Sequence, residues 1–212
     1  DNVVKTFSGF VEIKMPITEL SMTTANLLER TTNTSSSTAV NYYFDGKDIV
    51  IRTKQSGTFT SKNNTEIYND LFSVNTDAAK AIRELAKRDI TSGAIGKSYL
   101  PNSTAKRKDI AIMIARAVDV TTTKETKYQD IQNLIGGSTI QALLETSIMK
   151  GKTATQFSPY ANVTRQEGAI ILANMLRYLN DDVTKAHNEQ TSNYTDVKAL
   201  THEAKQSIAI LE

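Results

Sequence analysis

A repeat with an offset of 58 residues (from 99 to 157) constrains this chain more than any other feature of its sequence. Residues 99–118 (YLPNSTAKRKDIAIMIARAV) align with residues 157–176 (FSPYANVTRQEGAIILANML). The aligned pairs share their chemical character: Pro101 with Pro159, Arg107 with Arg165, Asp109 with Glu167, Ile90 with Ile148 and Gly93 with Gly151. Such self-similarity indicates one supersecondary unit used more than once, whose copies bury apolar faces against their neighbours.

A short motif marks the start of each copy: an aromatic residue, any residue, an aspartate and an aliphatic residue. It occurs as YNDL, YQDI and YTDV at residues 68–71, 128–131 and 194–197. Apolar residues at helical spacing follow each motif: Ala78, Ile82 and Leu85; Ile140, Leu143 and Leu144; Ala204, Ile208 and Leu211. The pattern predicts two complete units and a third that stops inside its first helix at Glu212. We expect further chain or a neighbour to cover the apolar face of that helix.

The first 66 residues follow a different pattern, rich in Thr, Ser and Asn. Short runs of alternating apolar and polar residues predict strands in FVEIKMPI, AVNYYF, DIVIRT and GTFTSK. Asp45-Gly46 lies between two of these runs and predicts a hairpin turn, because glycine tolerates a positive φ there. This part of the sequence is typical of a small β-domain.

The predicted fold class is therefore α+β and multidomain, with a small β-sandwich-like domain followed by mainly helical repeats. The predicted divisions are a β-domain at 1–66, a first repeat at 67–122, a second at 123–182, and a linker with the start of a third at 183–212.

Composition excludes several functional classes. The 25 basic residues are dispersed and the net charge is only +2, so we expect no nucleic-acid partner. The most apolar run, IAIMIARAV, is interrupted by Arg116, so we expect no membrane span. Without cysteine and with two histidines, the sequence offers no basis for a zinc site or a His-centred hydrolase. We therefore expect neither an enzyme nor a cofactor.

The segment NVTRQEGAIILANML, residues 162–176, begins like a capped helix. Thr164 and Glu167 have the spacing of a capping box, in which each side chain binds a backbone N–H at the helix start. Capping does not account for Arg165. The first copy has Lys106 in place of Thr164 but retains the arginine as Arg107. What both copies keep is an arginine with an acidic residue two positions later.

These motifs, in this order over residues 67–212, resemble the S-layer homology domain, by which many bacterial surface proteins hold to the cell envelope. The resemblance is carried by YQDI, SIMKG, FSP and NVTRQEGAIIL in the second copy, and by YNDL, AIRELAKRDITSG, YLP and KRKDIAIMIARAV in the first. It implies a pseudo-threefold arrangement of three repeats, with grooves that bind secondary cell-wall polysaccharide, commonly carrying pyruvylated amino sugars. It also implies a secreted protein at the bacterial cell wall, and the opening DNVVKTFSGF, which has no signal peptide, leads us to expect a piece of a longer exported protein.

By this resemblance, three kinds of residue line the grooves: the motif arginines, the opening aspartates and the turn glycines. An arginine can hold a pyruvyl carboxylate with two parallel hydrogen bonds, aided by the helix N-terminus. The aspartates have an alternative role as caps of the local turn, and the glycines as helix C-terminal residues. The predicted ligand-binding residues are Arg107, Arg165, Asp70, Asp130, Asp196, Gly93 and Gly151.

Departures from the family pattern leave a second function open. The chain has no tryptophan, and the positions where the family usually has one are Asp77, Ile135 and Glu203. The glycine that usually begins the turn is replaced by Asp89 and Ser147. Degenerate repeats of this kind are compatible with a surface-layer assembly module that contacts other surface-layer chains instead of a glycan.

Overall fold

The computed structural model has a mixed α+β fold and describes residues 6–16, 27–31, 37–62, 68–91, 97–179, 194 and 200–211. The chain forms two compact units. The first contains residues 1–103 and 116–119, and the second contains residues 104–115 and 120–212. The mixed α+β class agrees with the sequence prediction, whereas the four-part division and the pseudo-threefold arrangement remain predictions.

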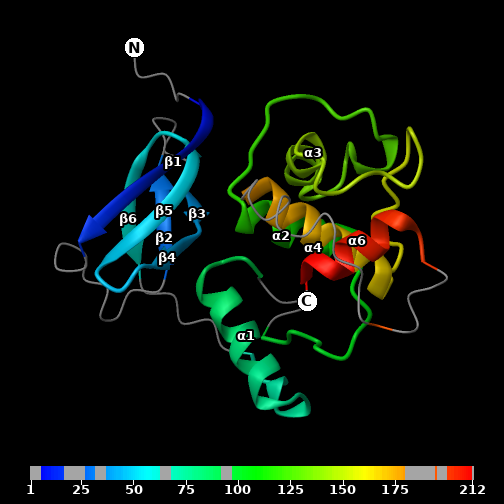
Figure 1. Cartoon of the computed structure of the whole chain (residues 1–212), viewed down its shortest axis with the longest axis horizontal. Helices are drawn as coiled ribbons and strands as arrows, with labels where there is room; N and C mark the ends of the chain where they lie inside the picture. Colours follow the sequence, from blue (N-terminus) through cyan, green and yellow to red (C-terminus); the bar gives the residue numbers. More distant parts are fainter. Residues whose placement is uncertain are drawn as a thin grey trace. The chain divides into compact units, whose positions relative to one another are not determined.

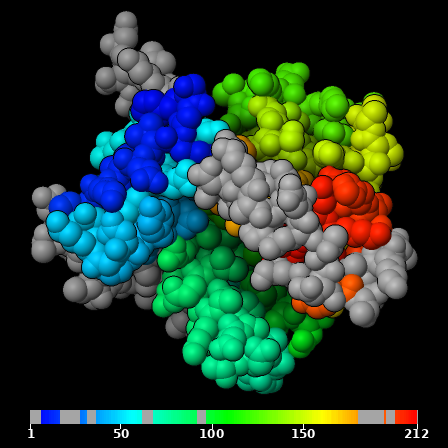
Figure 2. Space-filling model, viewed as in Figure 1, coloured from blue at the N-terminus to red at the C-terminus, as the bar shows by residue number. Residues whose placement is uncertain are grey.

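The first unit contains two antiparallel three-stranded sheets, ordered β1-β5-β4 and β3-β2-β6 (Figure 1). Their strands are β1 (Thr6–Pro16), β2 (Leu27–Thr31), β3 (Ser37–Val40), β4 (Tyr42–Phe44), β5 (Asp48–Gln55) and β6 (Thr58–Lys62). Leu28, Val40, Ile49 and Ile51 come from both sheets and form one buried hydrophobic cluster. The dark blue surface of β1 is visible in the space-filling view (Figure 2).

The predicted hairpin at Asp45-Gly46 joins β4 to β5. Phe44 pairs with Ile49, and Gly46 has a φ of 98°. The Asp45 carboxylate accepts hydrogen bonds from the backbone N–H groups of Lys47 (3.1 Å) and Asp48 (2.8 Å). Glycine is therefore needed here for the left-handed turn, as the sequence pattern indicated.

The repeat part of the first unit centres on α1 (Thr76–Lys87), preceded by the short 3-10 helix η2 (Leu71–Ser73). The Asn75 side chain caps α1 by accepting a hydrogen bond from the Ala78 N–H at 2.8 Å. The buried face of α1 consists of Ala79, Ile82 and Ala86, which pack with Tyr68 and Leu71. The opening motif thus supplies the aromatic and aliphatic partners of the helix that follows it.

The second unit contains the remaining helices of the described residues. They are α2 (Arg107–Ala117), whose last two residues belong to the first unit, η3 (Gln129–Ile131), α3 (Gly137–Glu145), α4 (Arg165–Leu179) and α6 (His202–Leu211). Helices α4 and α6 pack side by side (Figure 1). In α6 the buried residues are Ala204, Ser207, Ala209 and Ile210, while Leu211 is 41% exposed. The predicted helix is present, but Leu211 is not on its buried face.

The two copies share unusual backbone conformations at equivalent positions. Asp89 and Ser147, which replace the family's turn glycine, have φ values of 54° and 63°. Leu100 and Ser158, one residue before the aligned prolines, have φ values of 61° and 62°. Left-handed backbone is uncommon for residues other than glycine, so matching values 58 residues apart indicate that the duplication extends to local structure.

Candidate functional site

The opening aspartates hold the aromatic-x-Pro loop of their own repeat. The Asp70 carboxylate accepts hydrogen bonds from the backbone N–H groups of Tyr99 (3.0 Å) and Leu100 (2.7 Å). In the second repeat, the Asp130 carboxylate accepts hydrogen bonds from the equivalent N–H groups, those of Phe157 (3.0 Å) and Ser158 (2.7 Å). Both carboxylates are therefore committed to loop backbone. Asp70 makes no side-chain cap of the turn that follows it, so the turn-cap alternative is wrong for this residue.

Replacing Asp70 with Asn should remove an acid-sensitive component of folding stability. The two loop N–H groups lower the pKa of Asp70, because they stabilise the charged carboxylate. A lowered folded-state pKa means that this stabilisation is present above the ordinary aspartate pKa of about 3.9 and is lost as the pH falls through the lower folded-state value. Urea unfolding from pH 7 to pH 2 should therefore show a shallower acid decline for Asp70→Asn. Parallel declines for the variant and the unchanged chain would contradict this assignment.

Arg107 is buried and connects its helix to the second repeat. Only 3% of the residue is exposed, although arginine is rarely buried without partners. Its Nε donates to the carbonyl of Phe157 at 3.0 Å, and its Nη2 donates to the carbonyl of Lys150 at 2.6 Å. The guanidinium also lies 4.8 Å from the centroid of the Phe157 ring. Arg107 thus fixes the turn and the aromatic-x-Pro loop of the second repeat.

Glu167 supplies the countercharge at this junction. One of its oxygens lies 3.8 Å from Arg107 Nη1, and the carboxylate also forms an ion pair with Lys152. Burial acts to raise the pKa of Glu167, but hydrogen bonds and the two cations together lower it. Burial is also the main cause that lowers the pKa of Arg107, and Glu167 and Asp130 oppose it. Glu167, the acidic residue of the second motif, therefore balances the positive charge of Arg107, the arginine of the first motif.

The backbone at the start of α2 is used in the same junction. The N–H groups of Arg107 and Lys108 donate to the carbonyls of Ala161 and Pro159, each at 2.9 Å. In return, the Val163 N–H donates to the carbonyl of Ala105 at 3.1 Å. The first-turn donors of this helix are therefore satisfied by protein carbonyls, so they do not serve an anion.

Gly151 lies where the second-repeat turn crosses the opening motif. A Cβ at this position would lie 2.4 Å from Tyr128 Cε1 and 2.8 Å from the Thr153 carbonyl oxygen. The backbone must therefore approach closely here, which only glycine permits. The glycine is required by packing within the repeat, and its φ is not left-handed.

Arg165 has a different environment from its counterpart Arg107. It is exposed at the first position of α4. The predicted capping box beside it is confirmed: the Thr164 N–H donates to Glu167 Oε2 at 3.0 Å, and the Glu167 N–H donates to Thr164 Oγ1 at 3.2 Å. Within the described part of the chain, no partner of the Arg165 guanidinium is found.

The predicted site residues are thus only partly brought together. Arg107, Asp130 and Gly151 meet around the loop at residues 150–158, and Asp70 holds the corresponding loop of the first repeat. Gly93 and Asp196 lie outside the described residues. The groups that meet are directed at the chain's own backbone.

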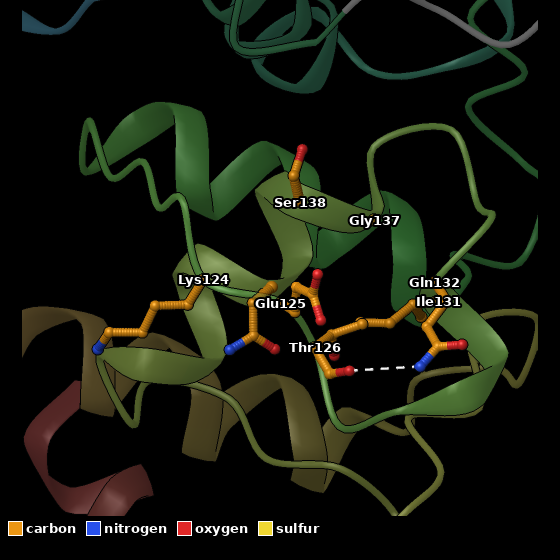
Figure 3. Close-up of a pocket in the computed structure, with 8 residues that line it drawn as sticks. Lys124, Glu125, Thr126, Ile131, Gln132, Gly137 and Ser138 are labelled. Carbon is orange, nitrogen blue, oxygen red and sulfur yellow. Dashed lines mark hydrogen bonds between the residues drawn. The ribbon is translucent and has the colours of Figure 1, made fainter.

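An open polar depression of about 430 Å³ lies beside the opening motif of the second repeat (Figure 3). Within it the Gln132 side chain donates to the Thr126 carbonyl at 3.5 Å. Gln141 Oε1 is buried and has no hydrogen-bond partner in the described structure. Except for Ile131 of the opening motif, sequence reasoning missed the lining residues because they form no motif; their only signal is the polar sequence on both sides of YQDI. The lining residues are Lys124, Glu125, Thr126, Ile131, Gln132, Gly137, Ser138 and Gln141.

Comparison with known proteins finds an S-layer homology domain at residues 128–169. An endoglucanase from Bacillus sp. (strain KSM-635) is 23% identical over 133 residues, which cover 62% of this chain and 14% of that protein. The surface-layer 125 kDa protein of Lysinibacillus sphaericus is 26% identical over 105 residues, covering 49% of this chain and 9% of that protein. The resemblance inferred from the motifs is therefore confirmed for the second repeat.

The chain matches only a small part of each relative, 14% and 9% of their lengths. No solved structure gives a significant match. None of the described helices has both the length and the apolar character needed to cross a membrane.

Proposed function

We propose that this chain is a noncatalytic module that anchors its parent protein to a bacterial cell envelope by binding cell-wall polysaccharide. The observation that carries the proposal is the S-layer homology domain at residues 128–169. Similarity to a surface-layer protein supports the same location. The endoglucanase relative supports it too, since this chain matches only 14% of that protein and an anchor is compatible with a separate catalytic domain.

The polar depression is our proposed saccharide subsite. Sugar hydroxyls need hydrogen-bond donors and acceptors that lie close together, and the depression offers amide, hydroxyl and carboxylate groups on Gln132, Ser138 and Glu125. The unpartnered Gln141 Oε1 can accept a hydrogen bond from a sugar hydroxyl. Lys124 Nζ, 3.3 Å from Glu145 Oε2, supplies a cation for an acidic substituent such as a pyruvyl group. A bound saccharide would thus satisfy an acceptor that the chain leaves unpaired.

In this proposal Asp130, Arg107 and Gly151 build the second repeat and do not contact the glycan. Their polar or packing contacts are made with backbone atoms of the loop at residues 150–158 or with Tyr128. The sequence-based prediction that Arg165 binds the glycan remains a separate prediction, because its guanidinium is exposed. A second candidate function, assembly with other surface-layer chains, is favoured by this exposed helix start.

Filling the depression should weaken wall binding. We expect Ser138→Trp to reduce the retention of the chain on purified walls of Lysinibacillus sphaericus at least about tenfold, because one lost binding contribution of 1.4 kcal/mol corresponds to that factor. Ser138 is exposed, so the fold should tolerate the change. The measurement is a cosedimentation isotherm with intact walls and with walls stripped of their polysaccharide.

Ser8→Trp, on an exposed position of β1, is the matched control and should retain binding. Equal binding to stripped walls would contradict polysaccharide recognition, and unchanged binding by Ser138→Trp would exclude the depression. Arg165→Ala distinguishes the two site assignments: loss of wall binding at low chain concentration would support the sequence-based prediction, and retention would support ours.

A further inference from the structure

Two helices of the first repeat end against the strand region, by which we mean the strands and connections at residues 6–62. Helix α1 ends at Lys87 and α2 at Ala117, and both ends belong with the strands to the first unit. The last carbonyls of an α-helix have no partner within the helix, and they give its end a partial negative charge. Whatever covers these two ends must therefore supply hydrogen-bond donors and positive charge.

Asn41, between β3 and β4, contacts both helix ends. Its Nδ2 donates to the Ala117 carbonyl at 3.2 Å, which gives one of the last carbonyls of α2 a donor. Its Oδ1 accepts from Nη1 of Arg88, the residue at which α1 is capped, at 3.1 Å. The Arg88 guanidinium also donates to the Tyr42 carbonyl and lies 4.6 Å from the centroid of the Tyr42 ring. Two adjacent residues of the strand region thus hold the ends of two helices.

Asp119 makes the third connection, just beyond the end of α2. Its φ is 51°, a left-handed value that aspartate tolerates better than most residues and that does not continue a helix. Its carboxylate forms the ion pair with Arg30 of β2 and accepts a hydrogen bond from Thr53 of β5. Gly57 leaves room for this arginine, because a Cβ there would lie 2.5 Å from Arg30 Cγ. A buried charge of the first repeat is therefore neutralised by the strand region.

The second repeat has different residues at these positions. The 58-residue offset places Thr146 on Arg88 and Arg177 on Asp119. Helix α4 extends past Arg177, whereas α2 ends before Asp119. The side chains of Thr146 and Arg177 each donate to an acceptor three residues earlier in the second repeat, the Leu143 carbonyl (2.6 Å) and Asn174 Oδ1 (2.8 Å). The first repeat thus differs from the second at the residues that meet the strand region.

We propose that the strand region serves as the cap of the first repeat. It supplies the donors and the countercharge that the ends of α1 and α2 require, and it unfolds together with that repeat. A unit of different sequence that covers the end of a repeat is a common device in repeat proteins. This role goes beyond the proposed glycan binding, because it does not involve the depression in the second repeat.

Cooperative unfolding follows from the kind of contact that joins the two parts. The apolar cluster of the strands and that of α1 are separate, and the polar contacts of Asn41, Arg88 and Asp119 connect the strands to the helix ends. Such contacts form only when both parts are folded and docked. Losing one partner leaves a desolvated donor, acceptor or charge behind, so opening of either part destabilises the other.

Hydrogen exchange of the intact chain, measured by mass spectrometry at low urea concentrations, tests the proposal. In the unchanged chain, backbone amides of β5 and α1 should open with the same free energy and the same urea dependence. Arg88→Thr, which introduces the residue of the second repeat, should speed exchange at least about tenfold in β5 as well as in α1, because hydrogen bonds to a charged donor are lost. Asn41→Ala is the reciprocal change and should speed exchange in α1 as well as in β5.

Arg83→Thr, at an exposed position of α1, is the matched control and should leave exchange in both elements unchanged. Helix α4 belongs to the second unit, so its exchange shows whether a variant has lost its fold as a whole. Faster exchange confined to α1 in Arg88→Thr, or confined to β5 in Asn41→Ala, would overturn the proposal. So would different urea dependences for β5 and α1 in the unchanged chain, a comparison that needs no substitution.

Discussion

Asp119→Ala is expected to lower the free energy of unfolding by about 3–5 kcal/mol, the loss typical of leaving one charge of a buried ion pair unpaired. Asp119 follows α2 and pairs with Arg30 of β2, and only 2% and 1% of their side chains are exposed. Thr53 Oγ1 of β5 also donates to Asp119 Oδ2 at 2.9 Å. The substitution would leave the Arg30 guanidinium buried without its carboxylate. Urea unfolding at pH 7 measures the loss.

A matched surface pair provides the control for this prediction. Glu84 and Lys87 lie 3.0 Å apart on α1 with more than a third of each side chain exposed, and Glu84→Ala should change the free energy of unfolding by less than about 1 kcal/mol. A loss for Asp119→Ala as small as that for Glu84→Ala would show that the buried pair does not form.

Replacing both Arg30 and Asp119 with apolar residues should recover much of the free energy of unfolding that Asp119→Ala loses. Burial raises the pKa of Asp119, and Arg30 and Thr53 only partly oppose this rise. The folded chain therefore holds this proton more tightly than the unfolded chain, so the stability that Asp119 contributes falls as the pH rises from its ordinary pKa through the raised value. Burying these two charges therefore has a desolvation cost. The double variant Arg30→Met/Asp119→Leu has no charge to desolvate, so its free energy of unfolding should be higher than that of Asp119→Ala.

The same ion pair explains why β2 escaped prediction from the sequence. In LLERT, Glu29 and Arg30 interrupt the apolar alternation that reveals a strand, yet Arg30 points into the interior. Its partner, Asp119, is 89 residues away. The local sequence pattern contains no information about a countercharge that is so far away in the sequence. By contrast, the hairpin at Asp45-Gly46 was predictable because its signal is confined to a few adjacent residues.

The sequence allowed the repeats to be predicted as units, but it did not indicate which partners their polar side chains contact. Spacing alone indicated the helices that became α1, α3 and α6. The opening aspartates and the first motif arginine were interpreted as ligand contacts, whereas Asp70, Asp130 and Arg107 bind backbone atoms of the repeats. A sugar hydroxyl and a backbone N–H are equivalent partners for a carboxylate, so composition and spacing do not distinguish them. The distinction requires knowing which loop lies opposite each residue.

Arg107 and Arg165 make that distinction measurable, because they share a motif and differ in environment. Arg107→Ala should lower the free energy of unfolding by about 2–4 kcal/mol, since it leaves the buried Phe157 carbonyl and the Lys150 carbonyl without this donor and opens a cavity beside the Phe157 ring. Arg165→Ala should lower it by less than about 0.5 kcal/mol, the usual range for an exposed position. Urea unfolding at pH 7 measures both.

Arg107→Lys separates charge from geometry at the same site. A lysine ammonium keeps the positive charge near Glu167 but cannot direct two fixed donors at the Phe157 and Lys150 carbonyls. The free energy of unfolding lost in Arg107→Lys should therefore be closer to the loss in Arg107→Ala than to the loss in Arg165→Ala. Equal and small losses for Arg107→Ala and Arg165→Ala would mean that the first motif arginine faces solvent as the second does. The junction between the repeats would then lack its central contact.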